Sequence, residues 1–213
     1  MKKIAVLLIA LMMTLTAVAL AEYEEPILFR GLEWGCSYAD IGEETELKLR
    51  GLSDCESHSV AYTMSGGEDI PFNKGISCEA WAGSDALDEI RQVAGHPVVN
   101  INLTFAYTPG DDGVISKEAG HTALYSAYYV LKPDDKEAAV DDLTQKLASL
   151  YGNDWILTTN ENGMVWKTWT GANGTMVALY DKGGSNNYLW IYYSFAGADD
   201  LLRNAQASNV GGL

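Results

Sequence analysis

Basic residues are scarce in this sequence of 213 residues. Lysine and arginine number 14 against 29 acidic residues, so the formal net charge is −15 at pH 7. A chain this acidic repels phosphate backbones and anionic lipid headgroups, which disfavours nucleic acid and membrane surfaces as partners. Solubility is the simpler interpretation of the acidity, and attraction to a basic partner or to cations is the functional alternative.

Cysteine and histidine are equally rare, with three of each. No Cys-x-x-Cys occurs, which argues against a redox site or a zinc ribbon. An exported chain can pair two of its three cysteines, and the sequence leaves every choice of pair open. We therefore expect a disulfide among Cys36, Cys55 and Cys78, whereas in an anaerobic habitat all three would remain free.

Motifs for catalysis or metal binding are also missing. The sequence contains neither Gly-x-Ser-x-Gly nor Asp-x-Asp-x-Asp-Gly. Cys55 and His58 are a conceivable Cys–His pair, but a disulfide cysteine beside a surface histidine explains them better, because catalytic pairs are usually joined by folding. The pair Asp111–Asp112 indicates solvated loop carboxylates more than a calcium site. We thus expect no catalytic residue, metal or cofactor.

The first 21 residues have the pattern of an export signal. Lys2 and Lys3 precede the unbroken apolar run Ile4–Met13, and Ala19–Ala21 forms a small-x-small cleavage site. The alternative is an anchor that is not removed, since residues 4–21 are just long enough to span a membrane. We expect cleavage after Ala21 and a secreted product that leaves the membrane.

Removal of this segment would leave residues 22–213 with 12 basic and 29 acidic residues, a net charge of about −17. This length suits one α+β domain with a sizeable core. The alternative is two tandem helix-plus-sheet modules, residues 27–107 and 121–196.

The second half of the chain has clear periodicity. Apolar residues alternate with smaller polar ones over 99–107, which predicts a half-buried strand, and a second strand is expected over 124–131. Asp134 or Asp135 should cap a helix that ends at Gly152. Its expected apolar stripe consists of Val140, Leu143, Leu147 and Leu150.

Three further strands are expected after this helix. Residues 164–170 and 175–180 flank an Asn-Gly pair that predicts a hairpin turn, and residues 188–195 form the last strand. In the first half, Ser37 and Asp40 predict the start of a short helix over 38–46, and residues 27–29 suggest a short strand. These elements indicate an α+β fold: an antiparallel β-sheet with one main helix packed on one face.

Aromatic residues, by contrast, are abundant, with six tryptophans and twelve tyrosines. Core and sheet packing is the common explanation of such rings. In the last strands, however, both faces carry bulky rings, and one helix covers only one face. We therefore expect a partner-binding patch on the face away from the helix, formed by Trp166, Tyr188, Trp190 and Tyr192.

Several segments resemble known proteins. Phe29–Ser37 has the pattern F-R-G-x-x-W-G-x-S, which resembles the opening of an uncharacterised family of exported proteins from gut Gram-positive bacteria. Segments 124–127, 147–152 and 169–173 resemble the same family. The order of helix and strands is similar to the β-lactamase-inhibitor-protein-like fold, which implies tandem α+β modules that present a sheet face to a partner. No contact residue of such an inhibitor is matched here.

These observations favour a binding function over catalysis. We expect a secreted module that binds a protein or peptide through an aromatic sheet face. A binder of cell-wall glycan or other carbohydrate is the alternative, because tryptophan and tyrosine also stack on sugars. A hydrolase that uses carboxylates is the least favoured possibility, since it would need two acids in one cleft.

Overall fold

The computed structural model describes residues 23–44, 47–54, 77–82, 84–107, 121–161, 163–183, 186–197 and 200–201. The expected leader, residues 1–21, and the Asp111–Asp112 pair lie outside these ranges. Within them, no helix has the length and apolar character needed to cross a membrane.

Strands dominate the described residues, and helices are few. The elements in chain order are α2 (Tyr38–Glu44), β1 (Leu49–Asp54), β2 (Ser77–Ala82), α3 (Ser84–Glu89), β3 (Gln92–Val93), β4 (His96–Tyr107), β5 (Thr122–Leu131), α4 (Lys136–Tyr151), β6 (Ile156–Thr159), β7 (Val165–Gly171), the 3-10 turn Ala172–Gly174, β8 (Thr175–Asp181) and β9 (Leu189–Phe195).

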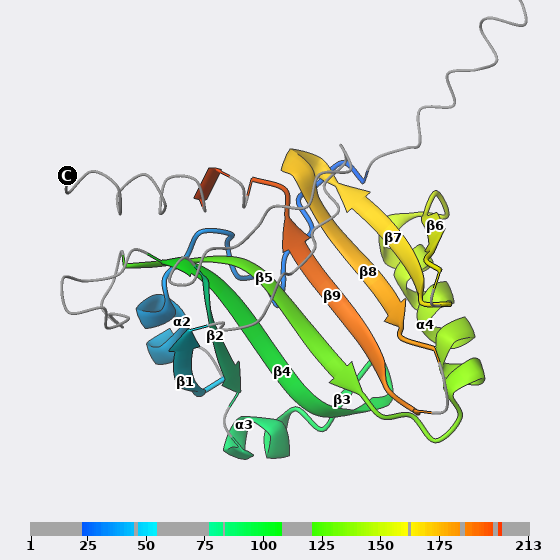
Figure 1. The fold of residues 1–213 in the computed structure, drawn as a ribbon, viewed down its shortest axis with the longest axis horizontal. Coiled ribbons are helices and arrows are strands. Elements are labelled where there is room, and N and C mark those ends of the chain that lie inside the picture. Colours follow the sequence, from blue (N-terminus) through cyan, green and yellow to red (C-terminus); the bar gives the residue numbers. More distant parts are fainter. Residues whose placement is uncertain are drawn as a thin grey trace, which may run out of the picture.

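The described strands form one antiparallel sheet in the order β1-β2-β4-β5-β9-β8-β7-β6, with β3 paired to β4 (Figure 1). The two strands at the centre, β5 and β9, come from different parts of the chain and pair in an antiparallel register from Ser126–Ser194 to Leu131–Leu189. The expected antiparallel α+β class is confirmed at this level.

Helix α4 begins and ends as its sequence predicts. The Asp135 carboxylate accepts a hydrogen bond from the Ala138 N–H at 3.1 Å, and Gly152 caps the other end with its N–H on the Ala148 carbonyl. The prediction that Leu150 is buried is wrong, because this side chain is 62% exposed. Tyr151 lies inward instead and meets the ring of Tyr23 edge-on at 5.3 Å.

The cap of α2, the β7–β8 turn and strand β4 form where the sequence predicts them, and β4 differs only by a bulge. Ser37 and Asp40 form the reciprocal cap of α2, in which the Ser37 N–H donates to the Asp40 carboxylate and the Asp40 N–H donates to the Ser37 hydroxyl. Asn173 has a φ of 59° in the β7–β8 hairpin, as an Asn-Gly turn requires. In β4 the inward alternation is interrupted by a bulge between Val98 and Asn100, which leaves Val99 41% exposed.

Residues 23–37 form an arm that fills the core and is not a strand beyond isolated bridges. The Tyr23 N–H donates to the Thr170 carbonyl at 3.0 Å, and the Ile27 N–H donates to the Thr175 hydroxyl at 2.7 Å. The Ile27 and Phe29 side chains are almost fully buried, at 1% and 0% exposure. The N-terminal arm is therefore part of the core of the C-terminal strands.

Gly171 lies where this arm crosses β7, and the crossing leaves no room for a side chain. A Cβ at this position would lie 2.6 Å from Ile27 Cγ1 and 2.8 Å from the Glu25 carbonyl oxygen. We expect Gly171→Ala to lower the free energy of unfolding by about 1–3 kcal/mol, because the arm must shift. Urea denaturation followed by circular dichroism measures this loss.

The neighbouring substitution Thr170→Ala is the control, since Thr170 is exposed and its carbonyl still accepts from Tyr23. It should change stability by no more than about 0.5 kcal/mol. Equal stability of the Gly171→Ala variant and the wild type would contradict the tight crossing.

Candidate functional site

The two faces of the C-terminal strands differ in what they contact. On β7, the Lys167 ammonium donates to the Thr144 hydroxyl of α4 at 2.8 Å, and the buried Trp169 indole donates to the Gly152 carbonyl at 2.9 Å. Successive side chains in a strand point to opposite faces, so Trp166 and Thr168 point away from α4. We call this second side of the sheet the far face.

A row of aromatic rings crosses three strands of the far face. Trp166 of β7 is the register partner of Tyr180 of β8, and Tyr180 is the partner of Trp190 of β9. The first two rings stack with centroids 5.0 Å apart and planes 16° apart, and the next pair is tilted at 5.4 Å. Tyr188 continues the series beside Trp190 at 6.4 Å. We call these four residues the aromatic row, and all four are half-buried.

A polar network follows in the next register position across β9, β5 and β4. The rings of Tyr192 and Tyr128 stack with centroids 5.5 Å apart. The Tyr192 hydroxyl accepts from Ser126 at 2.8 Å, and the Tyr128 hydroxyl accepts from the Asn102 amide at 2.8 Å. Hydroxyl and amide groups therefore extend the far face from the aromatic row toward the centre of the sheet.

Charge is missing from this part of the surface. Among the described strand residues of β4, β5, β7, β8 and β9, the far-face side chains are all uncharged: Asn100, Asn102, Thr104, Ser126, Tyr128, Val130, Trp166, Thr168, Thr170, Met176, Ala178, Tyr180, Trp190, Tyr192 and Ser194. Lys132 lies at the margin, where its ammonium is 5.8 Å from the centroid of the Tyr188 ring. Thr104, Ser126, Ala178 and Ser194 are buried, so the accessible part of the far face consists of the remaining residues, which are half-buried or exposed and include Trp166, Tyr180 and Trp190 of the aromatic row.

The structure brings three of the four expected site residues together directly. Trp166, Trp190 and Tyr188 belong to one row, but Tyr180 is the ring that joins them, and the sequence analysis did not single it out. Tyr192 lies in the adjacent row and stacks on Tyr128, which was also missed. The alternation of β8, with Val177 and Leu179 buried on the other side, was the signal that would have assigned Tyr180 to this face.

The other candidate groups are only partly within the described residues. Cys36 has a free thiol, and burial, with the nearby Asp40 charge, raises its pKa to about 11. Cys55 lies outside the described residues, and of Cys78 only the backbone in β2 is described. The described part of the chain holds no group of three or more His, Cys, Asp or Glu side chains able to bind a metal ion.

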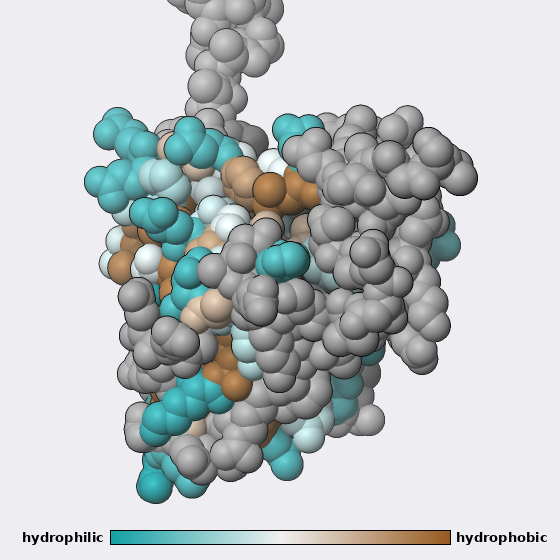
Figure 2. Space-filling model, turned by 90° about the vertical axis from the view of Figure 1, so that its left-hand side faces the viewer, coloured by the Kyte–Doolittle hydropathy of each residue, from teal (hydrophilic) through white to brown (hydrophobic). Residues whose placement is uncertain are grey.

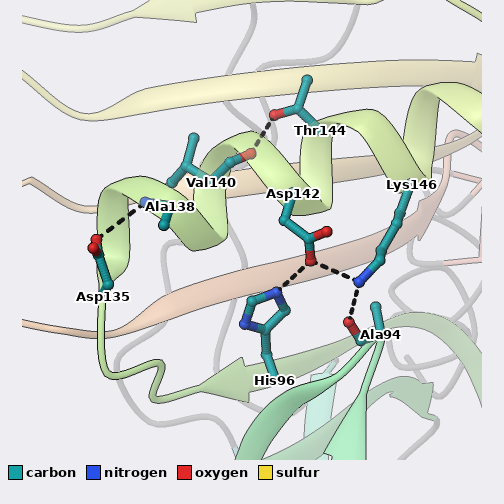
Figure 3. A network of polar contacts seen from close by, with 8 residues as sticks. All are labelled: Ala94, His96, Asp135, Ala138, Val140, Asp142, Thr144 and Lys146. Atoms are coloured by element: carbon teal, nitrogen blue, oxygen red, sulfur yellow. Dashed lines mark hydrogen bonds and ion pairs between the residues drawn. The ribbon is translucent and has the colours of Figure 1, made fainter.

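His96 takes part in a charged cluster with Asp142 and Lys146 (Figure 3). Its Nε2 and the Lys146 ammonium each lie 2.7 Å from the same oxygen of Asp142, and Lys146 also donates to the Ala94 carbonyl. A carboxylate can orient a catalytic histidine in this way. Here, however, the same oxygen also holds Lys146, so the cluster fastens the β3–β4 hairpin to α4.

A scan against protein-family models finds none that matches this chain, and searches of curated proteins and of solved structures likewise find no match.

The Asp142 cluster predicts a defined pH dependence. Hydrogen bonds from Lys146 and His96 lower the pKa of the Asp142 carboxyl below its usual value of 3.8. These contacts therefore stabilise the fold above that pH, and the stabilisation disappears as the pH falls through the lowered pKa. Asp142→Asn should be less stable than the wild type at about pH 7, and the difference should vanish toward about pH 2, as measured by urea denaturation. Asp141→Asn on the exposed side of α4 is the control, and a pH-independent deficit in Asp142→Asn would refute this account.

The two tryptophans of β7 should differ in their effect on stability. Trp169 is 1% exposed, and its indole N–H donates to the Gly152 carbonyl. Trp169→Ala should therefore lower the free energy of unfolding by about 3–5 kcal/mol. Trp166→Ala should cost at most about 1–2 kcal/mol, because this ring is half-buried on the far face. Thermal and urea denaturation of both variants test this. Similar losses would identify Trp166 as a core residue and remove it from the site.

Proposed function

We propose that this chain is a non-catalytic binding module that holds a protein or peptide partner on the far face of its sheet. The observation that carries the proposal is the aromatic row, four half-buried rings on an uncharged face away from α4. Partner surfaces are typically rich in tryptophan and tyrosine, whose large rings contribute most of the binding energy.

The orientation of the rings favours a polypeptide over a sugar. A sugar ring stacks on the open face of an aromatic side chain, but Tyr180 has Trp166 on one side and Trp190 on the other. Trp166 therefore covers one face of the Tyr180 ring, and the tilted Trp190 ring lies against its other side. Tyr128 and Tyr192 beside them are half-buried, and tyrosine is a residue type that antibody-like protein-binding surfaces use.

The proposal includes the architecture and cellular location that the sequence suggests. We propose that α4 is the main helix covering one face, and that two helix-plus-meander modules, α2 with β1, β2, β4 and β5, and α4 with β6–β9, join through β5 and β9. The strand order supports this arrangement. In this arrangement the boundary between the two modules lies at residues 132–135, whereas the sequence suggested modules 27–107 and 121–196. We further propose export, cleavage after Ala21 and membership of the exported family that Phe29–Ser37 resembles.

Recovery of a partner from native culture tests the function. Residues 22–213 serve as bait, with Trp190→Ala as the site variant. Leu157→Ala is the matched control, because Leu157 is 56% exposed on β6 but points to the opposite side, paired with Lys167. We expect chemical cross-linking and mass spectrometry to recover a protein with the wild type and with Leu157→Ala, and at least about tenfold less of it with Trp190→Ala.

Equal recovery by all three baits would contradict the use of the far face. Binding of the bait to insoluble polysaccharide or cell walls, lost in Trp190→Ala, would show instead that the face recognises glycan. Both measurements require the variants to be folded at the assay temperature, which circular dichroism establishes first.

A further inference from the structure

The tryptophans of this protein differ in how their indole N–H groups are used. The Trp34 indole donates to the Ile27 carbonyl at 3.0 Å, and the Trp169 indole donates to the Gly152 carbonyl at 2.9 Å. The indoles of Trp166 and Trp190 donate to no acceptor among the described residues, and neither nitrogen is among their buried unsatisfied atoms. Two hydrogen-bond donors therefore remain available on the far face.

The rest of the aromatic row favours the same kind of ligand atom. Because Tyr180 is flanked on both sides, its exposed part is the ring edge, which carries partial positive charge. Ring edges and indole N–H groups both attract a neutral acceptor such as a carbonyl oxygen. A charged ligand group at Trp166, Tyr180 and Trp190 would find no charged side chain among the described far-face residues of β7, β8 and β9 and would lose its hydration without compensation.

The Cα spacing of Trp166 and Trp190 can be compared with the repeat of an extended ligand backbone. Trp166 and Trp190 are in register with Tyr180 on the strand between them, so their Cα atoms are two strand spacings apart, about 9.5 Å. One turn of a polyproline II helix advances about 9.3 Å in three residues, which presents the carbonyls of residues i and i+3 on one side at this separation. In a β-strand, carbonyls on one side recur at about 6.7 Å or 13 Å, which fits less well.

We propose that the ligand of the far face is an uncharged, proline-containing polypeptide segment in the polyproline II conformation, which crosses β7, β8 and β9 along the aromatic row. Its carbonyls at positions i and i+3 accept from the indoles of Trp166 and Trp190. Its proline rings contact the edges of Tyr180 and Tyr188. This inference depends on the proposed function, because it names the chemistry of the partner at the same site. Aromatic surfaces recognise such segments at low entropic cost, since the segment is already extended and has unpaired carbonyls.

Selection from a random peptide library displayed on phage tests this proposal with residues 22–213 as the target. We expect enriched peptides to carry no net charge and to repeat proline at three-residue spacing. Synthetic copies should bind with an affinity that changes little with salt, because no charged contact is screened. A scrambled copy and a copy with two glutamates are the matched peptide controls.

Two variants of Trp190 distinguish the contribution of its indole N–H to binding from that of its aromatic ring. Trp190→Phe keeps an aromatic edge but removes the N–H, and should weaken binding about threefold to tenfold. Trp190→Ala should weaken it more, and Leu157→Ala should leave it unchanged.

The outcomes distinguish this inference from the proposed function. Enriched peptides that depend on Trp190 but are charged or lack proline would overturn the inference and leave the binding function intact. Failure to enrich any peptide that depends on Trp190 would also overturn it. If no enriched peptide depends on Trp190 and no protein recovered from culture depends on Trp190, both this inference and the proposed binding function are overturned.

Discussion

The backbone pairing of β5 with β9 is the constraint on which the rest of the structure depends. These strands are separated in sequence by α4 and three other strands, yet they lie side by side at the centre of the sheet (Figure 1). Their register aligns Leu131 with Leu189 on one face and Tyr128 with Tyr192 on the other. A shift of one residue would exchange the faces, burying tyrosine hydroxyls and exposing leucines, so the register also determines where the aromatic row lies.

The candidate site lies on the side of β7–β9 opposite the hydrogen bonds from β7 to residues of α4 and its C-cap. One side of β7–β9 meets α4 and the N-terminal arm, which bury Leu143, Leu147, Ile27 and Phe29. The far face keeps half-buried rings and hydroxyl groups. At the end of the molecule near α2 and β1, the described surface shows hydrophilic residues beside hydrophobic ones (Figure 2).

The sequence predicted the second half of the chain well because local signals and tertiary packing agree there. The Asp135 cap, the Asn173 turn and the alternation of β9 each specify a backbone conformation over a few residues. The first half was predicted poorly for a physical reason. β1 is irregular, and β3 has two residues, too few to show a period. Strand β6 was missed because all four of its residues are exposed, so no apolar alternation marks it.

The sequence predicted an aromatic patch on one face of the last strands, but it did not predict every residue that belongs to the patch. Alternation in β7 and β9 was enough to assign Trp166 and Trp190 to a face opposite the helix. The contribution of Tyr180 depends on the cross-strand register, which becomes visible only when β8 is placed between its neighbours. The bulge at Val99 and the inward turn of Tyr151 likewise depend on what each residue meets in space.

The N-terminal arm has a consequence for how the chain reaches its final form. The Ile27 N–H donates a hydrogen bond to the hydroxyl of Thr175, 148 positions later in the chain. The first residues of the arm therefore have nothing to pack against until β7 and β8 have formed. Contacts of such long range slow folding, because the loop between them must close first. Synthesis proceeds from the N-terminus, so the core stays open until nearly the entire polypeptide has emerged. Residues 23–37 are therefore made before the strands that they pack against, and they reach their final contacts only after those strands have formed.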